Sequence, residues 1–212
     1  MSDELPRIHR TSSWKTALLK TGLVAGGAVA ILLPAWLPNQ PSAPLSSGTV
    51  EFLQALLLAA AAAVMFGAQS HTGGYRPVAR ILGLCAVAAL IGELEDFLSQ
   101  FLGIRFPEVQ VIAVVLLVAL VTALRHKRIV VHFFSTVGRH AGSGFVAAAL
   151  LIIYVFNRVM GRPQFWQATL GDAYTPEVPE ICSAYLELLA CYLIFVGSLG
   201  FAISLTRRDP EN

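Results

Sequence analysis

The chain has 212 residues, of which 56% are hydrophobic and only 13% are charged, and its mean hydropathy is +0.67. Soluble domains carry about 25% charged residues, so this composition argues against a water-soluble globular protein and makes the lipid bilayer the expected partner. The formal net charge of +2 is small and no basic face is larger than a loop, which argues against a nucleic-acid partner.

Apolar runs of membrane-spanning length recur along the chain. A helix crosses the hydrocarbon core of a bilayer with about 20 apolar residues. We therefore predict an all-α fold, in which residues 1–212 form a single polytopic membrane domain of six transmembrane helices. The runs cover residues 21–37, 50–68, 77–103, 109–124, 141–161 and 178–206.

The first run has a second interpretation. A basic start, an apolar stretch and small residues near Ser42 and Ala43 also fit a cleaved signal peptide. Pro34 and Trp36 fit a cleavage region poorly, so a retained helix is favoured. Cleavage would leave five helices and the same orientation for the rest.

Lysine and arginine are concentrated in every second predicted loop. They precede the first helix, separate helices two and three and helices four and five, and close the chain, whereas the other loops carry few. Cytoplasmic loops are enriched in these residues. We therefore predict that both termini lie in the cytoplasm, which agrees with an even number of helices.

Small residues mark two expected close contacts between helices. The alanine run 59–63 in the second helix predicts a tight packing face, and Gly138 and Gly142 have the spacing of a GxxxG contact. Ser143 near His140 is weak evidence for a hydrolase, because neighbours at a helix start seldom hold a catalytic geometry.

Residues 126–140, HKRIVVHFFSTVGRH, mix basic and apolar side chains. They fit either an amphipathic helix along the cytoplasmic interface or an extension of the fourth helix. A metal site of His126, His132 and His140 is less favoured, because spacings of six and eight residues are weak evidence. A basic surface that contacts anionic lipid is the favoured interpretation.

Acidic residues interrupt the third apolar run in the stretch IGELEDFLSQ. Glu93 lies about 24 Å along the helix from Pro77, in the outer half of a core about 30 Å thick. Glu93 and Asp96 are three residues apart and share one helix face, whereas Glu95 points elsewhere.

Other helices deliver polar groups to the same outer layer. Glu187 lies about 13 Å inside the outer end of the sixth helix, on a stripe with Ser183 and Cys191. Glu51 and Gln54 begin the second helix, and Arg158 lies beside Asn157 near the outer end of the fifth.

An ionised side chain at the centre of a membrane helix costs about 2.5–3.5 kcal/mol on insertion scales, so these groups are expected to face the bundle interior. Arg158 is the expected counter-charge for Glu93, Asp96 or Glu187. Since the acids outnumber Arg158, the surplus would be hydrated, hold a proton or bind a cation. A buried network that only holds the helices in register is the simpler alternative.

Four stretches carry a resemblance: GTVEFLQALLL, IGELEDFLS, GRHAGSGF…NRVMGRPQFW and YLELLACYL. They resemble a group of small, uncharacterised polytopic proteins of bacterial inner membranes. Gly92 stands where that group often has arginine before the glutamate of the third helix. The resemblance implies a multi-pass protein of a bacterial inner membrane with a shared site, and it names no activity.

The leading hypothesis is a membrane protein, more plausibly not an enzyme, with a buried acidic site that binds or moves a proton, a cation or a small cationic solute. The site would comprise Glu93, Asp96 and Glu187, with Arg158, Glu51 and Gln54 beside them. The alternatives are a scaffold or subunit, in a homo-oligomer or a membrane complex, and a lipid-modifying enzyme. The sequence assigns no cofactor, and the unbroken apolar runs predict no discontinuous helix.

Overall fold

The computed structural model describes residues 26–27, 47–71, 73–102, 107–136 and 142–206. Apart from short turns and connections, this part of the chain is helical and contains no strand, which confirms the all-α fold. Short 3-10 turns follow α2, precede α3 and follow α8. The α-helices are α2 (Ser47–Ala68), α3 (Arg76–Leu102), α4 (Glu108–Arg125), α5 (Lys127–Thr136), α6 (Ser143–Leu151), α7 (Asn157–Met160), α8 (Pro163–Leu170) and α9 (Glu177–Thr206).

Five helical stretches of the described chain are long and apolar enough to cross a membrane, which is consistent with an integral membrane protein. They match the second to sixth predicted runs. The first run lies outside the described residues apart from Gly26 and Gly27, so the sixth helix and the sides of the termini stay predictions. The five are Thr49–His71, Arg76–Leu94, Glu108–Arg125, Ser143–Met160 and Glu177–Leu205.

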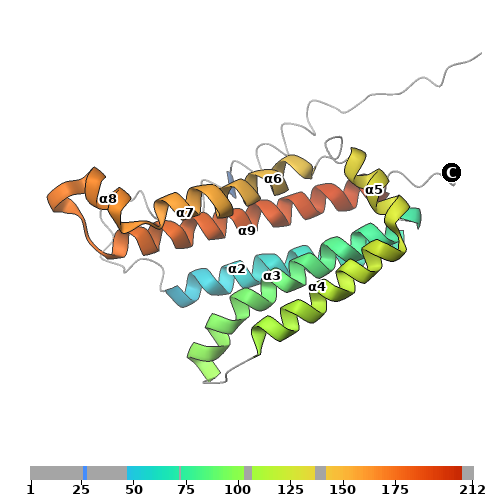
Figure 1. Cartoon of the computed structure of the whole chain (residues 1–212), viewed down its shortest axis with the longest axis horizontal. Coiled ribbons are helices and arrows are strands. Elements are labelled where there is room, and N and C mark those ends of the chain that lie inside the picture. The colour runs from blue at the N-terminus through green and yellow to red at the C-terminus, as the bar shows by residue number, and fades with distance from the viewer. Residues whose placement is uncertain (1–25, 28–46, 72, 103–106, 137–141, 207–212) are drawn as a thin grey trace, which may run out of the picture.

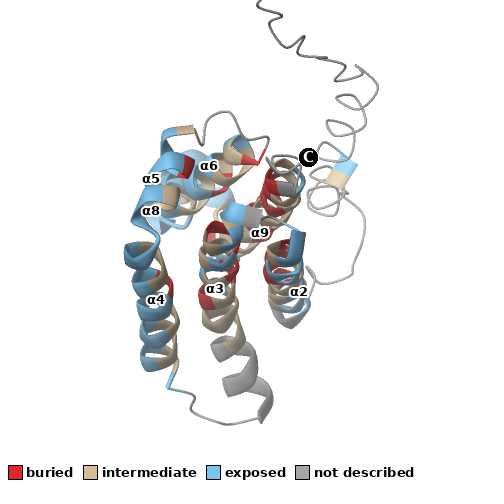
Figure 2. Ribbon diagram, turned by 90° about the vertical axis from the view of Figure 1, so that its right-hand side faces the viewer, coloured by how far each residue is buried: buried red, intermediate tan, exposed pale blue. Residues whose placement is uncertain are grey.

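The long helices form two layers. α4 packs on α3 and α3 on α2, while α6 and α7 pack on α9, and the contact between α2 and α9 joins the two layers (Figures 1 and 2). α5 crosses from one layer to the other at one end of the bundle (Figure 1). We call this the α5 end, and we call the opposite end, where α7 ends and α9 begins, the α8 end.

Alanine side chains allow α2, α3 and α9 to approach one another. Ala61 and Ala62 of α2 are buried with Ala86 of α3, and Ile194 and Phe195 of α9 pack against them. Between helices in lipid, small residues permit close backbone approach and dispersion contacts hold the pair. The tight packing face predicted from the alanine run is confirmed at these two positions.

The α5 end is closed by an aromatic side chain. α4 ends at Arg125, a turn at His126 follows, and α5 begins at Lys127. Phe133 of α5 is buried in a cluster that includes Met65 and Phe201. The segment is therefore a separate amphipathic helix, and its alternative interpretation as an extension of the fourth helix is wrong.

α6 and α9 touch through glycine backbones. A β-carbon added to Gly142 would overlap the carbonyl oxygen of Gly197 and lie 2.9 Å from the backbone nitrogen of Phe201. The predicted close contact at Gly142 is thereby confirmed, with Gly197 as its partner. Gly138 lies outside the described residues.

Candidate functional site

A chain of hydrogen bonds joins α7 to α9. The Nδ2 group of Asn157 donates to Oε1 of Glu187 at 2.6 Å, and the Oγ hydroxyl of Ser183 donates to Oδ1 of Asn157 at 2.6 Å. Ser183 Oγ also lies 3.4 Å from Glu187 Oε1. We call Asn157, Ser183 and Glu187 the Asn157 cluster. The amide accepts one hydrogen bond and donates the other, so it orients both partners.

A π-helical segment, Ile152–Phe156, explains why Asn157 faces α9. Ala149 of α6 is fully buried against α9, and Asn157 follows it by eight residues. In a regular α-helix eight residues would turn the side chain about 80° beyond two full turns. The wider i→i+5 turn takes up an extra residue, so Asn157 returns to the face that Ala149 presents. The helix is not interrupted, as the unbroken apolar run predicted, but it contains this one π-helical segment.

On α9, the predicted stripe of polar residues is present. Ser183 and Glu187 are four residues apart and both contact Asn157. Cys191, one turn further, is buried, and Glu93 of α3 and Glu187 both lie within electrostatic range of its thiol.

α2 approaches the start of α9 through two polar residues. The Gln54 side chain is 2% exposed, and its Nε2 donates to the carbonyl oxygen of Ala184 at 3.3 Å. Glu51 precedes it by three residues and is half-buried, with its Oε2 atom enclosed and without a hydrogen-bond partner. Gln54 therefore lies beside the α9 segment that carries Ser183 and Glu187, and Glu51 lies about one turn before it on α2.

The predicted burial of the acids is wrong for the described residues. Glu51, Glu93 and Glu187 are each half-buried, so they are not sealed inside the bundle. The physical reason is that the described helices stand in two layers, which do not enclose these side chains on every side (Figure 2). The side chain of Asp96 lies outside the described residues.

Arg158 lies apart from the hydrogen-bonded cluster. Its side chain is exposed, and within the described part of the chain it forms no ion pair with Glu187. The neighbouring Asn157 provides the contact to Glu187 instead. Sequence reasoning placed Asn157 in the outer layer but did not select it. Turning an uncharged amide toward another helix costs less free energy than turning the adjacent charged guanidinium there. This preference is the sequence signal that would have identified Asn157.

Oxygen atoms dominate the donor set of the Asn157 cluster. A carboxylate, an amide and a hydroxyl suit a proton or a hard cation. Within the described residues, no group of three or more His, Cys, Asp or Glu is placed to hold a metal ion. His126 and His132 are exposed at the α5 end, and His140 lies outside the described residues.

Comparisons of this chain with family models, curated proteins and solved structures found no match. Functional inference therefore depends on the geometry of the described residues.

Proposed function

We propose that this is a bacterial inner-membrane protein, with both termini in the cytoplasm, whose Asn157 cluster binds a proton or a small cation. The observation that carries the proposal is the 2.6 Å hydrogen bond from Asn157 to Glu187, which holds a carboxylate between two membrane-length helices. Carboxylates at membrane depth are rare because they are costly there, and they commonly serve proton or ion pathways.

The surroundings of the cluster support a cation as the ligand. Glu93 lies within electrostatic range of Cys191, one turn along α9 from Glu187, and Gln54 of α2 contacts the α9 segment that carries Ser183. Negative charge and oxygen donors therefore gather on this part of the bundle. Half-burial leaves Glu187 reachable from outside the protein, so a ligand does not have to cross a sealed core.

The π-helical segment is a second support. Single π-helical turns inside α-helices occur frequently at functional sites. Here the segment ends immediately before Asn157, so the orientation of the ligand-facing amide depends on it.

A ligand-dependent thermal shift tests the proposal. The full chain, in detergent, is unfolded by heat in sodium, potassium, magnesium or calcium chloride and in choline chloride at equal ionic strength, and also across acidic pH. A ligand at about 100 times its Kd stabilises the folded state by about 2.7 kcal/mol, or a Tm increase of roughly 5–10 °C for a chain of this size. Glu187→Gln keeps the side-chain shape and should remove this increase.

Glu180→Gln is the matched control, because Glu180 is exposed on the same helix two turns earlier. This variant should retain the full shift. No shift in the unchanged protein, or the same shift in Glu187→Gln, would contradict the proposal.

A subunit or scaffold role is the second candidate, and the exposed face of α4 favours it. Val109, Leu117 and Leu124 are 75%, 57% and 64% exposed, although α4 packs on α3. Lipid or a partner helix would cover this face. If a second copy covers it, the mass of the protein in nanodiscs should correspond to a dimer and Leu117→Lys should give the monomer; a monomer in the unchanged protein counts against self-association. The third hypothesis, a lipid-modifying enzyme, has no support from the position of the Asn157 cluster, because the apolar groove described below lies toward the opposite end.

A further inference from the structure

An apolar groove of about 430 Å³ lies at the α5 end, lined by residues of α3, α5, α6 and α9. Leu82, Phe134, Val146, Leu150 and Phe201 form most of its wall. Its lining also includes Ser143, Gly144 and Ala147 of α6. These small side chains leave open a space that larger side chains would fill. The groove therefore has the chemistry to accept a flexible hydrocarbon chain.

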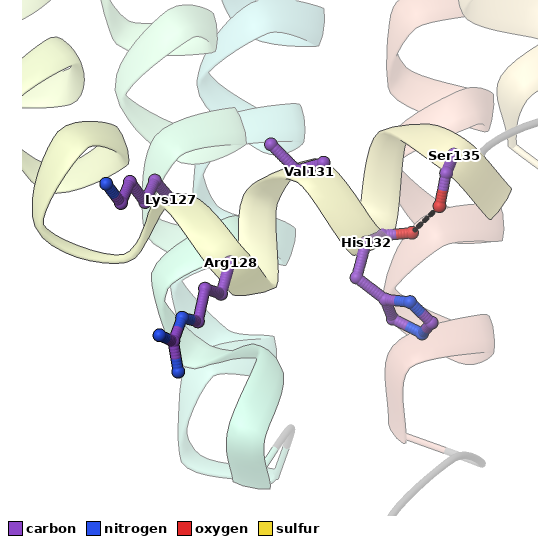
Figure 3. A pocket seen from close by; sticks show the side chains of 5 residues that line it. All are labelled: Lys127, Arg128, Val131, His132 and Ser135. Atoms are coloured by element: carbon purple, nitrogen blue, oxygen red, sulfur yellow. Dashed lines mark hydrogen bonds between the residues drawn. The ribbon is translucent and has the colours of Figure 1, made fainter.

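A basic hollow of about 480 Å³ lies along the same α5 helix. Lys127, Arg128 and His132 line it together with Val131 and Ser135, and Figure 3 shows the Arg128 and His132 side chains extending to the same side of the helix. All three basic side chains are exposed. α5 thus presents cationic groups on one flank and places Phe133 and Phe134 in the groove on the other.

Charge is unevenly distributed along the described bundle. Five of the seven lysines and arginines that the structure describes lie at the α5 end, whereas every acid with a described side chain lies in the half of its helix, or in the loop, toward the α8 end. The five are Arg76, Arg80, Arg125, Lys127 and Arg128, and the other two, Arg158 and Arg162, lie toward the α8 end. The acids are Glu51, Glu93, Glu108, Asp172, Glu177, Glu180 and Glu187.

We propose that the α5 end is a binding site for one anionic phospholipid, with the phosphate at Lys127, Arg128 and His132 and an acyl chain in the apolar groove. An amphipathic helix at the bilayer interface places its basic side chains at headgroup depth and its apolar side chains among the acyl chains. Anionic headgroups attract such basic segments. Among the acids whose side chains the structure describes, none lies at this end to compete for the basic groups.

The first predicted helix is a less suitable occupant than lipid. Gly27, one of its two described residues, lies so close to α9 that an added β-carbon would overlap the Tyr192 ring. Tyr192 is not among the residues that line the groove. A second copy in the same membrane orientation would bring its own basic α5 end, and none of its described acids, to this depth.

Native mass spectrometry of the full chain, titrated with dioleoyl-phosphatidylglycerol or dioleoyl-phosphatidylcholine, tests the site. The anionic lipid should bind more tightly, and the double variant Lys127→Gln/Arg128→Gln should weaken its affinity about 30-fold, from roughly fivefold for each charge. Ala147→Phe, at an exposed groove position, should weaken the binding of the anionic lipid by filling the acyl site.

Two matched controls test the location. Arg162→Gln removes an exposed charge at the α8 end, and Ala113→Phe adds the same ring to an exposed position of α4 outside the groove. Both should leave lipid affinity unchanged. All the substituted side chains are exposed, so the variants should keep the Tm of the unchanged protein.

Three results would overturn the proposal. Equal affinity for the two lipids would remove the role of charge. Loss of binding in the double variant with full binding in Ala147→Phe would mean surface adhesion without an acyl site. A dimer that forms in place of the lipid complex would assign the groove to a second copy of the chain.

Discussion

Phe133→Ala is expected to lower the free energy of unfolding by about 3–5 kcal/mol. The ring is 1% exposed and packs among Met65, Val78 and Leu205, with the Phe201 ring centroid 5.7 Å away. Truncation would leave a cavity where three spanning helices meet α5, and the neighbouring helices can collapse into it only partly. Reversible unfolding of the full chain in mixed micelles would measure the change.

Phe134→Ala is the control for this experiment. Phe134 is adjacent in sequence but 59% exposed, and its ring makes an edge contact with Phe133 at a centroid distance of 5.6 Å. Loss of an exposed ring should change the free energy of unfolding by no more than about 1 kcal/mol. Equal effects of the two substitutions would mean that Phe133 does not anchor α5.

Gly142→Ala is expected to destabilise the fold by about 1–3 kcal/mol, because the added methyl group meets backbone that cannot rotate away. The groups that it would meet are the carbonyl of Gly197 and the backbone nitrogen of Phe201. The helices would have to separate, which would also lengthen the contact from Asn157 to Glu187 further along the same pair. The same unfolding measurement reports the loss.

Gly144→Ala gives the matched comparison on the same helix. A β-carbon there meets nothing within 4 Å, and alanine favours a helix over glycine by about 1 kcal/mol. Stability should therefore stay equal or rise slightly. A similar loss at both positions would show that the glycine contact of α6 with α9 is not the cause.

The candidate site was only partly predictable. The spacing of Ser183 and Glu187 placed both on one face of a helix, since side chains four residues apart nearly align, and both side chains do contact Asn157. Asn157 itself could not be selected by periodicity. Its direction depends on the π-helical segment, which adds a residue to one turn and shifts every later position.

The sequence could not predict how deeply the acids are buried, and the reason is a different one. The cost of a charge in lipid predicts that it avoids the acyl chains, but this cost says nothing about whether the helices close into a ring. Here they form two layers, so Glu51, Glu93 and Glu187 are half-buried.

The sequence by itself determined the all-helical class and the five described membrane-length helices. Transfer of an apolar run into lipid depends on the composition of that run alone, and a helix satisfies its own backbone hydrogen bonds. Only the tertiary structure decided that Asn157 meets Glu187, that Gly142 meets Gly197, and that α5 forms an apolar groove with α3, α6 and α9. These contacts join residues far apart in the chain. They depend on how each helix is rotated and on the order of the layers, and sequences of the same hydropathy can differ in both.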